Sequence, residues 1–237
     1  MTWSILARDE SGYFGMAIAS RFFAVGSLCV HSRRGVGALS SQALLNPLYG
    51  PTGLDLLAQG FSPAQTIATL IAKDQGRDQR QLHLLPFTGL PAAHTGSACV
   101  DWCGHLVEDG LSVAGNMLAG PKVIEHTAQA FKDTRGKPMG DRLLAALDAG
   151  QAAGGDKRGK QAAALKIHMD EDYLQLDLRV DDHEEPLVEL RRLYNKSLER
   201  FQPFLECLPS RHRPSGITER NEIDAHIEKY LARIKGT

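Results

Sequence analysis

The order in which strands and helices are predicted constrains the fold more than any other feature of this sequence. Trp3, Ile5 and Ala7 alternate with the residues between them, which is the period of a strand, and a turn sequence at 9–12 leads into a return strand. The remaining predicted strands fall in clusters: 13–20, 25–32, 36–42, then 81–87, 91–95, 97–101, 104–108, 111–115, then 162–168 and 173–180. Clustered strands joined by short turns favour antiparallel sheets.

Pairs of helices are predicted between the strand clusters. The first pair is 51–59 and 63–73, and the second of these opens with the capping box Ser62-Pro63-Ala64-Gln65. The second pair begins at Pro121 and continues at 139–149. A doubly wound parallel sheet needs strands that alternate singly with helices, so this order instead predicts an α+β fold with antiparallel sheets between helical layers.

The composition changes after residue 182. Apolar residues recur at helical spacing over 186–201 and 218–234, and a proline-bearing stretch at 203–216 separates them as a linker. We therefore expect a main domain over 1–192 and a helical C-terminal extension over 193–237. Because the extension carries apolar faces that a compact first domain leaves uncovered, we also expect a homo-oligomer.

Length, charge and cysteine usage exclude several classes of protein. A chain of 237 residues fits one large domain, and a formal net charge of -1 provides no field for nucleic acid or an anionic membrane. No signal peptide or run of membrane-spanning length is visible, so the prediction is a cytoplasmic protein without nucleic-acid or membrane partners. The four cysteines lack a framework spacing and are expected as thiols, and no cofactor motif is present.

Thr2 is the first candidate for chemistry. Removal of Met1 would leave a hydroxyl nucleophile and a free α-amine on one residue, and an α-amine titrates near neutral pH and can accept the hydroxyl proton. The strand alternation places Ser4 on the same face as Thr2, so Ser4 is a second hydroxyl candidate. The alternative is that Thr2 is an ordinary residue at the start of a strand.

Three other segments carry candidate binding groups. Lys157, Arg158 and Lys160 crowd a glycine-bearing loop that lacks Walker spacing and suits an anion, although a solvated turn is the alternative. Arg21 follows the second strand and is placed to meet a substrate carboxylate. Asn116 lies in a glycine-bearing loop before a helix, a setting typical of an oxyanion-stabilising group.

The segment 94–105 contains His94, Cys99, Cys103 and His105 at close spacing. It matches no zinc pattern, so we expect no bound metal and assign His94 and His105 as secondary catalytic candidates that line a pocket or orient loops. Cys99 as a nucleophile is a weaker alternative.

Seven segments together carry a resemblance to a known family. In order they are TWSILARD, ASRFFAVG, SSQALLNPLYG, HTGSACVDWCGH, GNMLAGP, GGDKRGKQAAAL and LRVDDH. They resemble the family called domain of unknown function 1028 over about residues 1–192, a branch of the N-terminal-nucleophile (Ntn) hydrolase fold related to proteasome β-subunits. The resemblance implies a four-layer αββα sandwich with Thr2 where related hydrolases carry their nucleophile. The sequence departs from the proteasome pattern, which has a lysine on an early strand to tune the nucleophile, because no lysine precedes Lys73 here.

The sequence therefore predicts a hydrolase of an amide C–N bond in a small anionic metabolite. Thr2 is the expected nucleophile, Asn116 the oxyanion donor, and Arg21 with the basic loop the anion-binding groups. Two alternatives remain open: a non-catalytic ligand-binding or assembly protein that keeps the fold, and a metal-dependent hydrolase that uses His94, Cys99 and His105.

Overall fold

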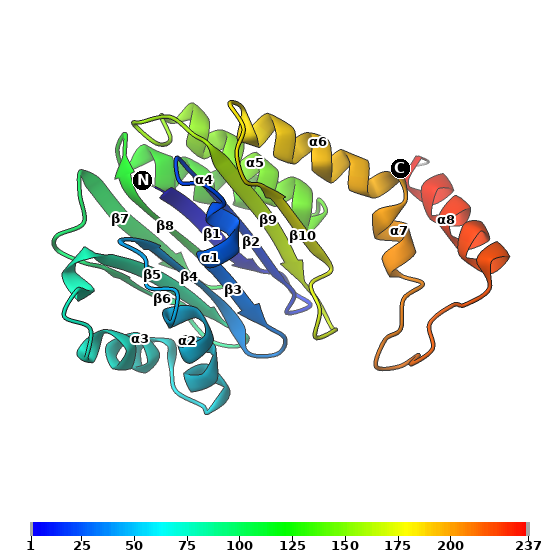
Figure 1. Ribbon diagram of the computed structural model, residues 1–237, viewed down its shortest axis with the longest axis horizontal. Helices are drawn as coiled ribbons and strands as arrows, with labels where there is room; N and C mark the ends of the chain where they lie inside the picture. The colour runs from blue at the N-terminus through cyan, green and yellow to red at the C-terminus, as the bar shows by residue number, and fades with distance from the viewer. Residues whose placement is uncertain (1, 236–237) are drawn as a thin grey trace.

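Two antiparallel sheets form the centre of the molecule (Figure 1). The computed structural model describes residues 2–235. The larger sheet has the order β10-β9-β2-β1-β8-β7 and the smaller one β3-β4-β5-β6. The strands are β1 Thr2–Arg8, β2 Phe14–Ser20, β3 Val30–Arg33, β4 Gly37–Ala43, β5 Arg80–Pro86, β6 Ala92–Thr95, β7 Trp102–Glu108, β8 Leu111–Leu118, β9 Ala162–His168 and β10 Leu176–Val180.

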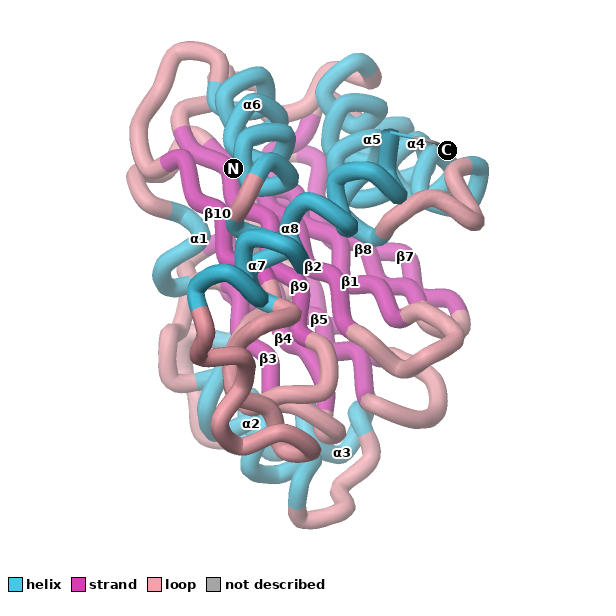
Figure 2. The backbone as a smooth tube through the Cα atoms, turned by 90° about the vertical axis from the view of Figure 1, so that its right-hand side faces the viewer, coloured by secondary structure: helices cyan, strands magenta, loops and turns pink. Residues whose placement is uncertain are grey.

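Helices cover the outer face of each sheet (Figure 2). Helices α4 (Lys122–Asp133), α5 (Met139–Ala152) and α6 (Pro186–Glu199) pack on the larger sheet, and α2 (Tyr49–Ala58) and α3 (Pro63–Ala72) pack on the smaller one. The predicted four-layer αββα sandwich is confirmed. Among the described residues, no helix combines the length and the apolar character that a membrane span requires.

Strand β1 lies in the middle of the larger sheet, between β2 and β8. Its alternation is the predicted one: Trp3 and Ile5 belong to the apolar core beneath α4 and α5, whereas Ser4 and Leu6 face the smaller sheet. Because β1 is central, its first residue, Thr2, is held by a strand on each side.

Two strand predictions were wrong. The segment predicted as a strand at 25–32 begins as the short helix α1, Val25–Leu28, and only then enters β3. Gly26 permits this packing, since a Cβ at that position would lie 2.3 Å from the Cβ of Ala164 on β9. Residues 97–101 form a turn rather than a strand, because the amide of Ala98 donates to the carbonyl of Asp78.

The C-terminal segment departs from the main body (Figure 1). Helix α7, Phe201–Leu205, overlaps the stretch predicted as a linker, and α8, Arg220–Lys235, completes the arm. Helix α6 passes through the expected boundary at residue 192, and its Leu190 and Tyr194 are buried in the core of the larger sheet. The division into two units remains a prediction.

A network of buried polar side chains joins the two sheets, and we call it the polar seam. It consists of Ser4, Ser40, Gln42, Gln81, His83, Ser112 and Asn116. The Ser4 hydroxyl donates to Gln42 Oε1 at 2.7 Å, so His83 Nε2, 2.8 Å away, donates to Ser4 Oγ. His83 Nδ1 then accepts from Ser112 Oγ at 2.8 Å. Burial lowers the pKa of His83 to about 3, with a smaller effect from His105, so the ring is neutral at physiological pH.

Gln81 is the centre of the polar seam. Its Oε1 accepts from Gln42 Nε2 at 2.8 Å and from Asn116 Nδ2 at 3.0 Å. Its Nε2 lies 2.8 Å from the carbonyl oxygen of Gly115 and 2.9 Å from Thr95 Oγ1. A single amide therefore fixes side chains from three strands, β4, β6 and β8, and sets the direction in which the Gln42 and Asn116 amides point.

We expect truncation after Gln202 to leave the sandwich folded. The arm contacts the body through exposed groups, including Tyr173 Oη donating to the Pro209 carbonyl and Arg211 pairing with Asp172, and such surface contacts contribute little. Thermal unfolding of the truncated protein should stay cooperative, with a midpoint within about 5 °C of the full chain. As the matched control, truncation after Glu185 removes the buried α6 residues Leu187, Leu190 and Tyr194, each worth roughly 1.5–3 kcal/mol, and should destroy the fold. Insoluble protein from the first truncation would show that the arm completes the core.

Substituting Gln81 by Met should destabilise the protein by roughly 2–5 kcal/mol. The change keeps the volume but leaves the Gln42 and Asn116 amides without their acceptor in a buried setting. Thr66 provides the control, because its hydroxyl is equally buried and, within residues 2–235, has no hydrogen-bond partner. Thr66→Val should be neutral or stabilising. Equal stability of the Q81M and T66V proteins in urea unfolding would contradict the role given to Gln81.

Candidate active site

A cavity of about 420 Å³ opens where the polar seam ends. Gln42 and Asn116 belong to both, and they share the cavity with Thr2 at the start of β1. This volume falls within the range of small-molecule sites. The structure therefore brings Thr2 and Asn116, two residues predicted from the sequence, into one concave site.

Thr2 is positioned by its place in the sheet. It pairs with Ser20 on β2 and with Asn116 on β8, and it is 6% exposed. Its Oγ1 lies 3.0 Å from Ser20 Oγ, a contact that sets the side-chain rotamer. The hydroxyl is thus held in a cavity wall rather than on open surface.

Two residues with left-handed backbone conformations line the cavity. Ala43 has φ 66° and Met117 has φ 55°, and each directly follows an amide residue of the polar seam, Gln42 or Asn116. A non-glycine residue with positive φ costs of order 1–3 kcal/mol, and such strain clusters at functional sites. The Met117 amide donates to the Val100 carbonyl at 3.2 Å, which ties the turn at 97–101 to this wall.

Two arginines lie at one side of the cavity. Arg21 and Arg158 both line it, and the Arg21 Nη1 donates to the carbonyl oxygen of Arg158. Asp156 anchors them: its carboxylate accepts from the Arg158 amide at 2.8 Å and from the Arg21 amide at 3.2 Å. The Arg158 guanidinium lies 3.5 Å from the same carboxylate. The structure therefore brings Arg21 and Arg158, two of the residues predicted to bind an anion, to the same cavity.

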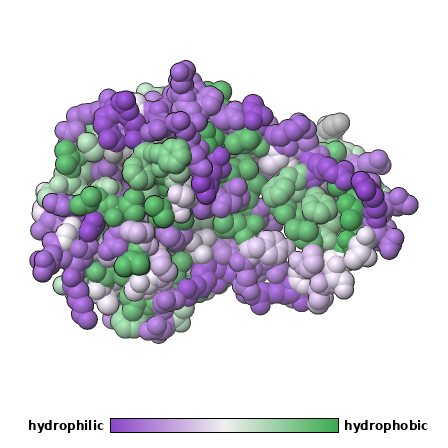
Figure 3. Space-filling model, in the orientation of Figure 1, coloured by the Kyte–Doolittle hydropathy of each residue, from purple (hydrophilic) through white to green (hydrophobic). Residues whose placement is uncertain are grey.

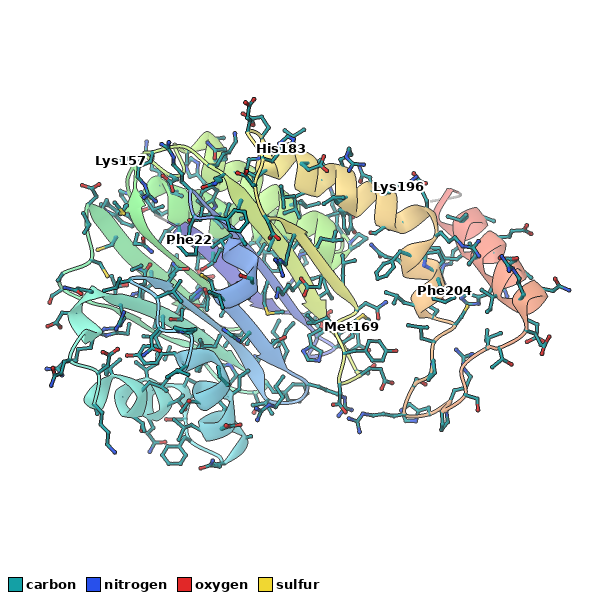
Figure 4. The ribbon with its side chains drawn as sticks, in the orientation of Figure 1. Phe22, Lys157, Met169, His183, Lys196 and Phe204 are labelled. Atoms are coloured by element: carbon teal, nitrogen blue, oxygen red, sulfur yellow. The ribbon has the colours of Figure 1, made fainter. Side chains whose placement is uncertain are left out.

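The other two cations of the predicted basic loop do not line the cavity. Lys160 pairs with Glu185 at 2.6 Å. Lys157 is exposed on the loop before β9, where Figure 4 labels it.

The remaining predicted catalytic residues lie away from the cavity. Ser4 is fully buried in the polar seam. His94 Nε2 contacts the Arg77 carbonyl at 2.9 Å, and His105 Nδ1 contacts Thr95 Oγ1 at 2.9 Å. Burial lowers the pKa of His105, and nearby His94 lowers it further. Over residues 2–235, no group of three or more histidine, cysteine or acidic side chains is arranged to hold a metal ion.

Two thiols line the cavity, from Cys29 and Cys99. Burial raises the pKa of Cys29 to about 12. Burial also raises the pKa of Cys99, and Cys103 adds to this effect. A raised pKa keeps both groups as neutral thiols at physiological pH, so neither has the thiolate character of a nucleophilic cysteine.

Sequence reasoning missed several residues that build the site. Gln42 and Asp156 lie in segments that carry the family resemblance but were not named as site residues, and Gln81 and His83 lie in a segment predicted only as a strand. A signal was present in β4 and β5, whose inner faces are otherwise lined by leucine and alanine. Polar side chains alternate on that face, at Ser40 and Gln42 in β4 and at Gln81 and His83 in β5. Buried polar residues at period two indicate a hydrogen-bonded seam between sheets.

Comparison with known proteins assigns the family. The sequence profile of the family of unknown function DUF1028 matches residues 2–190. The crystal structure of protein SPO2555 from Silicibacter pomeroyi, a DUF1028 protein, superimposes with a TM-score of 0.85 at 30% identity, covering 92% of this chain and 96% of that one. Anbu, the ancestral β-subunit from Yersinia bercovieri, shows a distant likeness, with a TM-score of 0.39 at 14% identity, covering 83% of this chain and 94% of its own. No curated protein matches the chain. With the profile, the solved relative and the αββα sandwich in agreement, the chain belongs to the DUF1028 family.

Proposed function

We propose that the protein is an N-terminal-nucleophile hydrolase that cleaves an amide C–N bond in a small anionic metabolite. The observation that carries the proposal is the position of Thr2, whose hydroxyl lies in a cavity that also presents an amide donor and two guanidinium groups. Hydroxyl, amide and cation are the three kinds of group that amide hydrolysis of an anion requires.

In the proposed mechanism, loss of Met1 frees the Thr2 amine. Met1 lies outside the described residues. The freed amine takes the proton of the Thr2 hydroxyl, and Oγ1 attacks the substrate carbonyl. The protonated amine then gives that proton to the leaving nitrogen as the C–N bond breaks, which leaves an ester on Thr2 and releases the amine product. Water, activated by the same amine, then hydrolyses the ester and restores Thr2.

Asn116 is the proposed oxyanion donor. One hydrogen of its Nδ2 is used on Gln81, which leaves the second for the cavity. The neighbouring Met117 amide already donates to the Val100 carbonyl. The side chain of Asn116, rather than the Met117 backbone amide, therefore supplies the oxyanion donor. The polar seam thereby fixes the donor before substrate arrives, as oxyanion stabilisation requires.

In this proposal, two arginines take the role of the early-strand lysine that proteasome-like enzymes have and this chain lacks. Arg33 pairs with Asp55 at 2.8 Å and His31 contacts the Leu28 carbonyl at 3.0 Å, so neither lines the cavity. The guanidinium groups of Arg21 and Arg158 do line it, and nearby positive charge lowers the pKa of an amine. They favour the neutral Thr2 amine that can act as a base.

A non-catalytic ligand-binding or assembly protein is the second candidate, and its supporting observation is the same cavity. The two proposals differ at the N-terminus, because a retained Met1 leaves no Thr2 amine. The homo-oligomer and the cytoplasmic location also remain predictions, and light scattering that gives a monomer mass would contradict the first of them.

Substitution of Thr2 tests the hydrolase directly. With protein of verified N-terminus and a substrate found by screening ureido, N-acyl and amide metabolites, Thr2→Ala should lower kcat roughly 10³-fold or more. The melting temperature should change by only a few degrees, because the change removes one hydrogen bond, to Ser20. Thr2→Ser should retain part of the activity.

Ser4→Ala is the matched control within the same strand. Ser4 belongs to the buried polar seam, so its loss should reduce stability more than kcat. Full activity of T2A, or equal loss of kcat in T2A and S4A at matched stability, would exclude Thr2 as the nucleophile.

A further inference from the structure

The two walls of the cavity differ in chemistry. One wall carries Arg21 and Arg158, from the loops that follow β2 and precede β9. The other wall carries Leu44 and Leu45, from the loop after β4 in the other sheet, and Val100 from the turn at 97–101. The Ala98 amide donates to the Asp78 carbonyl at 2.7 Å, which attaches that turn to the smaller sheet. The cationic and the apolar side chains therefore come from different segments that meet at the cavity.

The arginine wall has an excess of positive charge. No acidic residue lines the cavity within residues 2–235, and the carboxylate behind the wall is Asp156, whose side chain is fully buried. One carboxylate accompanies two guanidinium groups, so the cluster keeps a net charge of about +1 by simple counting. Such a cluster complements one carboxylate or similar anion, which guanidinium groups bind through charge-assisted hydrogen bonds.

The wall of Leu44 and Val100 has an excess of exposed apolar surface. Leu44 is 57% exposed and Val100 is 59% exposed, and Phe22, which directly follows Arg21, adds apolar surface beside the arginines at 47% exposure. In the space-filling view, apolar surface gathers over the region of α1, next to Phe22 (Figures 3 and 4). Covering these side chains removes apolar area from water and is favourable.

We infer that the cavity binds an amphipathic carboxylate, and that the hydrolysed amide is an N-acyl amino acid. Its carboxylate lies on Arg21 and Arg158, and its apolar acyl chain lies on Leu44 and Val100. This inference deepens the proposed function and rests on it, because it assigns the two sides of the amide to the two walls of the cavity that contains Thr2.

Calorimetric titration of the T2A protein tests the inference without turnover. The probes are N-hexanoylglycine, N-hexanoylglycinamide, which lacks the charge, and N-acetylglycine, which lacks the chain. N-hexanoylglycine should bind tightest. Removing the charge should weaken binding about tenfold or more, and each methylene lost from the buried chain should weaken it by up to about fourfold.

Substitutions in each wall test which part of the ligand that wall binds. Arg21→Ala and Arg158→Ala should each weaken binding of N-hexanoylglycine about tenfold and leave the glycinamide unchanged. Arg34→Ala is the matched control, because Arg34 is an exposed arginine that does not line the cavity. Leu44→Ser should reduce the dependence on chain length, whereas Leu90→Ser, at an exposed leucine also outside the cavity, should not.

The outcomes separate this inference from the proposed function. Equal affinity for the acid and the glycinamide, or unchanged affinity in both R21A and R158A, would overturn the amphipathic-carboxylate ligand. Binding as expected, with no hydrolysis of N-hexanoylglycine or of longer N-acyl amino acids by protein that has lost Met1, would sustain the ligand class and overturn the hydrolase. Turnover of an uncharged amide by protein that does not bind N-hexanoylglycine would sustain the hydrolase and overturn the substrate class.

Discussion

The hydrogen bonds of the Gln81 amide between the two sheets are the interaction on which the rest of the site depends. A sandwich of this kind ordinarily joins its sheets with apolar side chains, as Leu6, Met16 and Leu85 do elsewhere in this inter-sheet core. Beside the cavity, hydrogen bonds replace them, and a buried polar network stabilises the fold only when its members are paired. Gln42 and Asn116 are paired with Gln81, so the same bonds that join the sheets fix the amides that line the cavity.

The two sheets supply different groups to the site. The larger sheet supplies Thr2 on its central strand and the two arginines on adjacent loops, while the smaller sheet supplies the apolar wall after β4. A ligand in the cavity therefore contacts both sheets. The left-handed residues Ala43 and Met117, one from each sheet, both line the cavity, and their strain is tolerated because the seam residues beside them are fixed by several hydrogen bonds.

The sequence predicted the layers but not the seam. Local periodicity identified β1, β2 and the capping box at Ser62, because alternation and capping are properties of neighbouring residues. It failed at 25–32 and 97–101, where contacts with Ala164 and Asp78, distant in the chain, decide the conformation. The residue types of Thr2, Asn116, Arg21 and Arg158 suggest chemistry, so these four were singled out as candidates, and the structure places them at one cavity. The pairing of Gln81 with Gln42 and Asn116 depends on the register of two sheets, which a single sequence does not display.

The central claim is that Thr2, with its amine freed, is the nucleophile of the cavity, and acylation mapped by mass spectrometry tests it most directly. The protein is incubated with an activated hexanoyl ester, its N-terminal sequence is determined, and the modified residue is located by peptide mapping. We predict a hexanoyl group that hydroxylamine releases, and hence an ester of the Thr2 hydroxyl rather than an amide of its amine, in chains that have lost Met1, and no such ester in chains that retain it. Acylation of Cys29 or Cys99 instead, or amide hydrolysis by protein whose intact mass still includes Met1, would contradict the account.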